Sequence, residues 1–348
     1  MSIQNFNSQP ARVNRLKGEI LRHADPKEVL GMTGQNKKHP RNVGDNVTFR
    51  RWLPFGNVDN QWITTANVDT FANAHLTAEG VTPSADTLQA VDVTVALNQY
   101  SCLYAVTDKT VDMYEDDVPS EMKKQTGQRI GLVREMVRYG ILKGMTNAYF
   151  AGGSDRSTVA ASISLRMIRN ITKNLKRHHA EMVTKVLDSS VKFGTSSVEA
   201  SYLVFCHTDL ESNIRDLEGF KHVADYGNRQ IVHPLEIGSC ESFRFILSPE
   251  LAAYADSGAA VGSTGLYSTT GTNIDVYPVI VAAEDAWGQV ALRGAKALDV
   301  SYIPPGTKDG SDPLGQRGWI GAKTYFNCLM LNQGWAALLE CGADDLDG

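Results

Sequence analysis

Two segments in the first third of the chain alternate between apolar and polar residues. Apolar side chains occupy every second position of residues 91–97, the period of a half-buried strand, and a less regular alternation covers residues 47–53 and stops at Pro54. The chain between them is polar and contains a strong turn signal at residues 80–84. Loops of this size are usually functional or reach towards another molecule. Residues 47–98 are therefore predicted to form a long hairpin.

A helical period replaces this alternation from about Val118 to Tyr149. Asp117 is placed to cap the first turn, and Gly152-Gly153 would end the helix. Acidic residues precede basic ones along it, the order that the helix dipole favours. A helix of this length is expected to span the whole subunit. Its apolar stripe consists of Ile130, Val133, Val137 and Ile141.

The rest of the chain predicts an α+β fold without internal repeats. A second helix is expected over residues 159–177 and another over residues 209–217. A loop rich in Gly, Ser and Thr at residues 257–273 is expected to be flexible and exposed. Apolar runs predict strands at residues 202–206, 243–247, 276–282 and 336–340.

Residues 1–46 are polar, with one amphipathic stretch from Val13 to Leu30, and hold too little apolar surface to fold alone. They are predicted to form an extended arm. The whole chain is ordinary for a folded protein, with 348 residues, 42% hydrophobic and 21% charged, which excludes a disordered chain. Five scattered cysteines favour buried free thiols, and neither a secretory signal nor a membrane span is predicted.

The formal charge of −5 conceals a split between the two parts of the chain. Residues 1–51 carry a net charge of +6, so the remainder carries −11. Basic chain ends bind nucleic acid or an acidic protein surface in many proteins, and in others they are simply solvated. Composition leaves these alternatives open.

No motif for catalysis, phosphate binding or metal binding is present, and no cofactor is expected. Residues 115–117 are acidic and could bind a cation, but helix capping explains the same residues at lower cost and is the favoured interpretation. Cys206 and His207 would face opposite sides of a strand, which argues against a nucleophile and its base. The acidic end, Asp344 to Asp347, is expected to be disordered or to lie on a neighbouring molecule. An arm and a hairpin that cannot fold alone point to assembly.

The order of several short motifs resembles the major capsid proteins of tailed bacteriophages. Similarity extends over about residues 47–342, and within that group it points to the family typified by podophage N-four. The segments that carry it are Gly80–Ser84, Tyr100–Thr107, Ala148–Gly153, Gly238 with Phe243–Phe245 and Ser248-Pro249, and Asp312–Gly321 with Lys323–Phe326.

This resemblance implies the Hong Kong 97-type capsid fold, an α+β fold with an N-terminal arm, an extended hairpin loop, a peripheral domain and an axial domain. The loop at 257–273 would then point towards a capsomer axis. The implied parts are the arm at 1–46, the hairpin loop at 47–98, the peripheral domain with its spine helix at 99–154, the axial domain at 155–311, a peripheral return strand at 312–331, and an axial end with an acidic tail at 332–348.

The resemblance also implies a function: self-assembly into pentamers and hexamers of an icosahedral shell that encloses double-stranded DNA, in a virion assembled in the host cytoplasm. The implied partners are further copies of the chain, a portal protein, a separate scaffolding protein and possible decoration proteins. Three alternatives stay open, namely the shell of a nanocompartment with the same fold, an enzyme without linear motifs, and a DNA-binding protein that uses its basic arm.

Charged residues of the arm, the hairpin and the long helix, together with one tryptophan of the hairpin, are the candidates for contacts between subunits. Opposite charges on neighbouring copies would set the register of such contacts more than their affinity. These candidates are Arg12, Arg15, Lys17, Arg50, Arg51, Trp52, Glu115, Asp116, Asp117, Arg129, Arg134 and Arg138.

Overall fold

The structure is a computed structural model in which the chain divides into two compact units. Unit 1 contains residues 1–47, 95–141 and 288–329, and unit 2 contains residues 48–94, 142–287 and 330–348. No described helix is long and apolar enough to cross a membrane. The structure describes residues 28–40, 42–52, 73, 76–82, 88–113, 117–183, 200–226, 231–262, 264–292, 298–308, 310 and 312–346.

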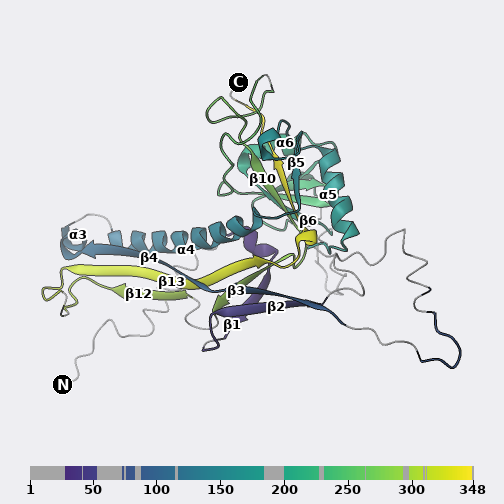
Figure 1. Ribbon diagram of the computed structural model, residues 1–348. Helices are drawn as coiled ribbons and strands as arrows, with labels where there is room; N and C mark the ends of the chain where they lie inside the picture. Colours follow the sequence, from purple (N-terminus) through teal and green to yellow (C-terminus); the bar gives the residue numbers. More distant parts are fainter. Residues whose placement is uncertain are drawn as a thin grey trace, which may run out of the picture. The chain divides into compact units, whose positions relative to one another are not determined.

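Unit 1 is built on a five-stranded sheet organised around one long strand, β13 (Figure 1). Two strands, β4 and β12, pair with β13 in antiparallel fashion, and β1 pairs in parallel with β11 at the other end of the sheet. The strands are β1 (Gln35–His39), β4 (Asn98–Thr107), β11 (Trp287–Leu292), β12 (Leu298–Ile303) and β13 (Arg317–Met330).

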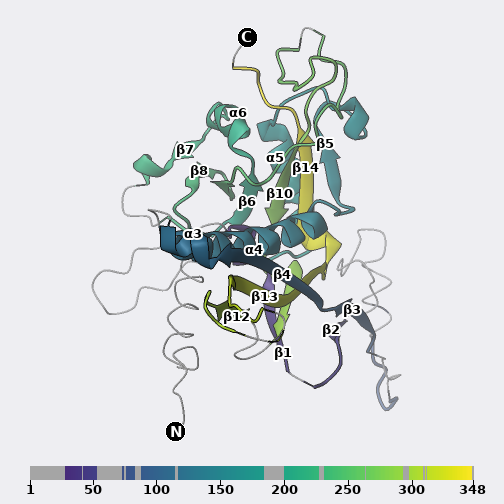
Figure 2. The same cartoon turned by 90° about the vertical axis from the view of Figure 1, so that its left-hand side faces the viewer.

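Helix α4 (Val118–Leu142) lies along this sheet in both views (Figures 1 and 2). Ile130 of the predicted apolar stripe is buried against Val300 and Ala322 of the sheet. The predicted cap is confirmed, because Asp117 Oδ1 accepts a hydrogen bond from Ser120 N at 3.2 Å. A short helix, α3 (Asp108–Met113), precedes α4.

The predicted end of the long helix at Tyr149 is wrong. α4 stops at Leu142, and residues 148–150 form strand β5 (Ala148–Phe150), which pairs in parallel with β14 (Ala336–Cys341). Backbone groups that pair with another strand cannot also bond to the preceding turn of a helix. Pairing with a distant strand thus overrides the helical period of the last turn.

Strands β2 (Asn46–Trp52) and β3 (Ala90–Ala96) form a two-stranded sheet, at the positions where alternation predicted strands. Arg50 of β2 binds Asp92 of β3 through two hydrogen bonds of 2.8 Å. Most of the predicted hairpin beyond these strands lies outside the described residues.

Unit 2 contains a seven-stranded sheet with the order β5-β14-β10-β6-β9-β8-β7. Every residue of its central strands β10, β6 and β9 is buried, which explains why these segments are apolar runs without alternation. The further strands are β6 (Tyr202–Cys206), β7 (Lys221–His222), β8 (Glu236–Cys240), β9 (Phe243–Leu247) and β10 (Tyr277–Ala282).

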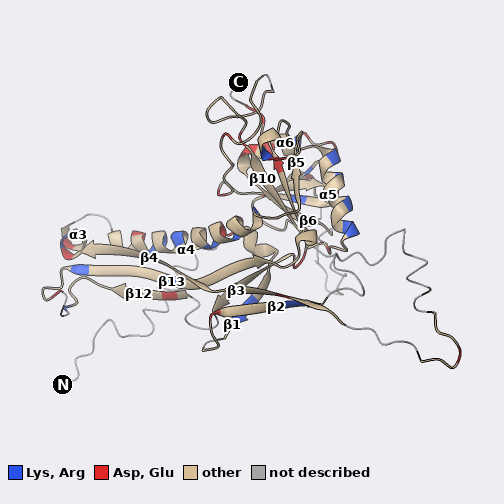
Figure 3. Ribbon diagram, viewed as in Figure 1, with Lys and Arg blue, Asp and Glu red and all other residues tan. Residues whose placement is uncertain are grey.

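Helix α5 (Leu165–Arg177) begins six residues after the predicted start at Val159 and buries Ile168, Ile171 and Leu175 in the core of unit 2. Its sequence contains five Lys or Arg and no acidic residue, so it carries a row of positive charge (Figure 3). The predicted helix at residues 209–217 is shorter, and consists of the 3-10 turn η5 (Thr208–Leu210) and α6 (Glu211–Arg215). The other 3-10 turns are η3 (Leu30–Met32), η4 (Arg156–Thr158), η6 (Val223–Asp225) and η7 (Gln333–Trp335).

The loop at residues 257–273 is held in place more than its composition predicts. Asp256 Oδ1 accepts a hydrogen bond from the backbone N–H of Asn273 at 2.7 Å, and Leu266 is buried. The described part of the acidic end lies on this loop within the same chain, because the backbone N–H of Asp345 bonds to the carbonyl of Gly265 at 2.9 Å. Amino-acid composition alone does not predict these backbone contacts.

The chain passes between the two units at the ends of elements. It leaves unit 1 for unit 2 after residue 141, where the long helix ends. It returns to unit 1 at residue 288, because β11 and β12 belong to the sheet of unit 1. The division into peripheral and axial domains that the resemblance implied stays a prediction.

Candidate functional site

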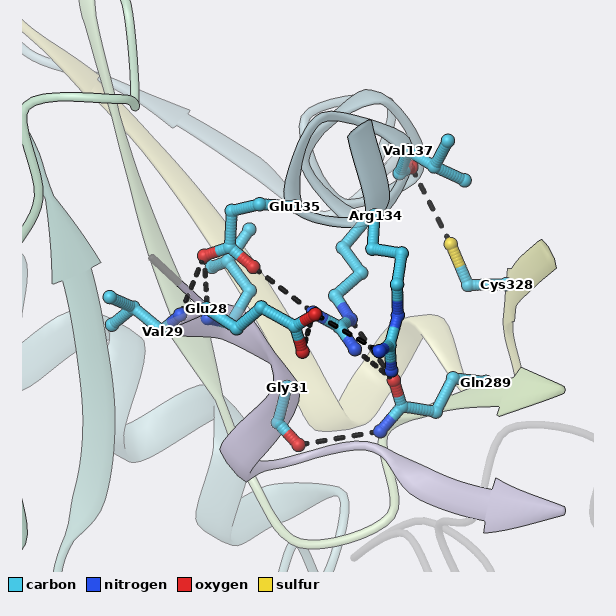
Figure 4. Close-up of polar contacts among 10 residues, drawn as sticks. Glu28, Val29, Gly31, Arg134, Glu135, Val137, Gln289 and Cys328 are labelled. Carbon is cyan, nitrogen blue, oxygen red and sulfur yellow. Dashed lines mark hydrogen bonds and ion pairs between the residues drawn. The ribbon is translucent and has the colours of Figure 1, made fainter. Parts of the chain in front are cut away.

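A largely buried cluster of charged and polar side chains joins three distant parts of unit 1. We call it the arm junction: Glu28, Arg134, Glu135, Arg138 and Gln289 (Figure 4). Glu28 comes from the segment predicted to be the arm, the next three from α4, and Gln289 from β11. Spacings of three and four residues place the α4 members on one face of the helix.

Glu135 holds the backbone of the arm segment. Its side chain is completely buried, and Oε1 accepts hydrogen bonds from the backbone N–H groups of Val29 at 2.9 Å and Leu30 at 2.8 Å. Burial raises the pKa of Glu135, while these N–H groups and Arg138 act in the opposite direction. A buried carboxylate with three donors is well suited to fix the path of the chain.

Arg138 is the centre of the arm junction and is 1% exposed. Its Nη1 donates to Glu28 at 3.0 Å and to Glu135 at 3.2 Å, and Nε and Nη2 both donate to Gln289 Oε1. Arg134 adds an ion pair with Glu28 at 3.1 Å. Two carboxylates and two guanidinium groups therefore neutralise one another within a buried space.

The packing around Arg138 leaves no room for larger neighbours. A Cβ atom added to Gly31 would lie 3.1 Å from Arg138 Cζ, and the carbonyl of Gly31 accepts a hydrogen bond from Gln289 Nε2. The guanidinium lies 5.1 Å from the ring centroid of Phe326, within the range of a cation–π contact. Gly31 is thus needed for close approach.

The part of the predicted arm that the structure describes belongs to unit 1. Val29 and Leu30 are buried, and β1 adds an edge strand to the sheet. One helix carboxylate binds the backbone of residues 29 and 30, and so fixes the chain on α4 at this point. The arm junction can therefore anchor a chain end, and it holds no group poised for catalysis.

The candidate residues of the sequence are distributed unevenly over the structure. Arg134 and Arg138 meet in the arm junction, where Arg138 is enclosed by its own subunit, so any effect of it on a neighbour would be indirect. The guanidinium of Arg129 lies 4.8 Å from the ring centroid of Tyr104. Candidates outside the described residues are Arg12, Arg15, Lys17, Glu115 and Asp116.

The remaining candidates lie on β2 and at the start of α4. Arg50 is paired with Asp92, and Trp52 is 58% exposed. Asp117 caps α4, and its hydrogen bonds with Ser120 lower its pKa. Whether these residues touch a neighbouring subunit stays a prediction. The described residues contain no cluster of His, Cys, Asp and Glu that could hold a metal ion.

Sequence patterns did not point to three members of the arm junction, namely Glu28, Glu135 and Gln289. Glu28 and Gln289 lie 110 and 151 residues from Arg138 along the chain, and no local pattern records such a contact. The spacing between Glu135 and Arg138 is a signal for a salt bridge on a helix, but it does not distinguish a buried pair from an exposed one.

Comparison with solved structures identifies the fold. The capsid of Ralstonia phage GP4 is similar over 90% of this chain and 88% of that chain, with a TM-score of 0.66 and 12% sequence identity. The capsid of cyanophage P-SCSP1u is similar over 90% and 87%, with a TM-score of 0.55 and 11% identity. The chain has the capsid fold of tailed bacteriophages. This is the Hong Kong 97-type fold that the motifs implied.

Sequence comparison points in the same direction. The chain is 19% identical over 264 residues to a protein of Pseudomonas phage KPP21 described as "Major capsid protein", over 70% of this chain. The chain spans 66% of the length of that curated relative. No family model matches the sequence. Within the Hong Kong 97-type fold, the arm junction joins the arm segment to the long helix.

Proposed function

We propose that this chain is the major capsid protein of a tailed bacteriophage, a structural protein of the virion and not an enzyme. Copies would assemble as pentamers and hexamers into an icosahedral shell around the phage DNA. The observation that carries this proposal is the similarity of fold to phage capsids over 90% of the chain. The similarity to a phage protein described as a major capsid protein supports it.

The parts of the chain take separate roles in this proposal. Unit 1, with its long sheet and α4, corresponds to the peripheral domain, and unit 2 to the axial domain near the capsomer axis. Residues 47–98 lie over a neighbouring subunit as the hairpin loop. The order of the motifs that carry the resemblance supports a place in the family typified by podophage N-four.

The arm junction gives the arm a fixed origin in this assembly. Residues 1–27 carry basic side chains, and the chain after residue 51 carries a net charge of −11, so the arm of one subunit complements the body of the next. Glu135 and Arg138 hold residues 28–31 against unit 1 and so determine where the arm leaves the subunit. A portal protein and a separate scaffolding protein are the expected further partners.

Gradient sedimentation of the full-length chain, produced alone and together with the scaffolding protein of its phage, tests this function. The proposal predicts fast-sedimenting particles that contain this chain as their main component. Recovery of only monomers or small oligomers under both conditions would contradict it. Shells that enclose a protein cargo and never contain DNA would favour a nanocompartment.

A further inference from the structure

Unit 2 contains a cavity of about 410 Å³ that is lined by polar side chains. Arg51 of β2 contributes to its wall together with His178, which follows α5, and with residues 331–334 between β13 and β14. None of the described residues that line this cavity is acidic. A water molecule takes about 30 Å³ of liquid, so the space is much larger than a single small ion requires.

Among the residues that the structure describes, three buried N–H donors at this cavity find no hydrogen-bond partner: Nε and Nη1 of Arg51 and Nδ2 of Asn332. Asn332 is 8% exposed. Its Oδ1 accepts a hydrogen bond from the backbone N–H of Gly334 at 3.1 Å. A backbone N–H can only donate, which fixes the oxygen on that side and leaves the amide nitrogen as the free end.

Two side-chain acceptors at the cavity, by contrast, already receive hydrogen bonds from the same chain. Gln333 Oε1 accepts from the backbone N–H of Thr146 at 3.1 Å, and Asn147 Oδ1 accepts from Asn174 Nδ2 at 3.3 Å. Burial lowers the pKa of Arg51. The described lining of the cavity therefore offers a positive charge and free donors, and it contains no carboxylate.

The neighbouring arginine shows what is missing. Arg50 already holds a carboxylate of its own chain, because its Nε and Nη2 each donate to Asp92 at 2.8 Å. Successive residues of a strand point to opposite faces, so Arg51 cannot share this partner. A carboxylate is the ordinary acceptor-only partner of a guanidinium, and a buried guanidinium without one is unfavourable.

We propose that this cavity binds the carboxylate of an aspartate or glutamate from a second copy of the chain, with Arg51 and Asn332 as its donors. The inference rests on the proposed function, because a shell brings copies of the chain into contact. The chain after residue 51 carries a net charge of −11, so acidic side chains are available on a neighbouring copy. The free donors and the room for a protruding side chain fit such an occupant.

Zero-length coupling in assembled shells tests this proposal. Arg51→Lys places a primary amine in the cavity and keeps the positive charge, and a carbodiimide joins an amine only to a carboxylate in direct contact. Shells are assembled from a mixture of ¹⁴N- and ¹⁵N-labelled subunits, coupled, digested and examined by mass spectrometry. We expect a linked peptide pair that joins the amine at position 51 to an acidic residue and contains both isotopes. A link within one chain only, or no link, would overturn the proposal.

Arg50→Lys is the matched control, since the amine at that position should couple to Asp92 of the same chain and give peptide pairs of a single isotope. If Arg51→Lys does not assemble, a cryo-electron microscopy map of unsubstituted shells decides. An acidic side chain of a neighbouring copy within about 4 Å of Arg51 supports the proposal. An empty cavity, or an isolated phosphate in it, overturns it. Failure of the unsubstituted chain to form shells would refute the proposed function. Intact shells with an empty cavity would refute only the proposal made for this cavity.

Discussion

Replacing Glu135 by Gln should release the start of the described chain from α4. The substitution keeps the size of the side chain but removes the negative charge that accepts from Val29 N at 2.9 Å and Leu30 N at 2.8 Å. It also sets an amide group against Arg138 Nη1, which donates to Glu135 at 3.2 Å. Hydrogen bonds to a charged group contribute about 1.5–3 kcal/mol each, and an amide oxygen recovers part of that. We expect the free energy of local opening to fall by about 2–3 kcal/mol.

Hydrogen exchange followed by mass spectrometry measures this opening directly. A loss of about 2–3 kcal/mol should speed exchange of the amides at Val29 and Leu30 by roughly 30- to 150-fold. Glu121→Gln is the matched control, because Glu121 lies exposed on the same helix and its side chain contacts Lys124 and Gln125 on the helix surface. Its exchange at residues 29 and 30 should change by no more than about twofold. Equal exchange in Glu135→Gln and the unsubstituted chain would refute the anchoring role of the arm junction.

Three further substitutions test the packing and the buried charges. Gly31→Ala should destabilise unit 1 by about 1–3 kcal/mol in chemical unfolding, because the added Cβ would lie 3.1 Å from the guanidinium of Arg138, which is held by hydrogen bonds. The control Gly140→Ala lies on the open face of α4 and should stabilise unit 1 by up to about 1 kcal/mol. Arg156→Met should lower the free energy of unfolding of unit 2 by about 3 kcal/mol, because it removes the ion-pair partner of the Glu340 carboxylate, which is 1% exposed. An unchanged midpoint of chemical unfolding would argue against a stabilising role of this pair. Burial raises the pKa of the Cys341 thiol from 9.0 to about 12. The stability that the neutral buried thiol contributes is therefore complete below pH 9 and is lost as pH rises towards 12. Cys341→Ala should remove about 1–2 kcal/mol of the stability loss between about pH 7 and pH 10, measured by chemical unfolding at both pH values.

The sequence predicted those elements whose pattern is local. Strict alternation placed β3, apolar runs placed β6 and β9, and the acidic residue before the long helix proved to be its cap. Where tertiary pairing competes with a local period, the prediction was wrong. The last predicted turn of the long helix, for example, is instead strand β5 beside β14.

The arm junction shows a different limit of sequence reasoning. Arg134 and Arg138 are candidates because they stand out as charges on a helix. The burial of Arg138, however, depends on Glu28 and Gln289, which lie more than a hundred residues away along the chain. Single-sequence patterns record periodicity and spacing, and they do not record which distant segment covers a face. The free donors of Arg51 and Asn332 likewise became visible only with the tertiary contacts.

Cryo-electron microscopy of the particles formed by the full-length chain tests the central claim most directly. Units 1 and 2 would be fitted separately into the map of a single subunit. The account predicts closed icosahedral shells built of pentamers and hexamers, with a subunit map into which both unit 1 and unit 2 fit. A preparation that contains only monomers or small discrete oligomers, with or without scaffolding protein, would contradict it.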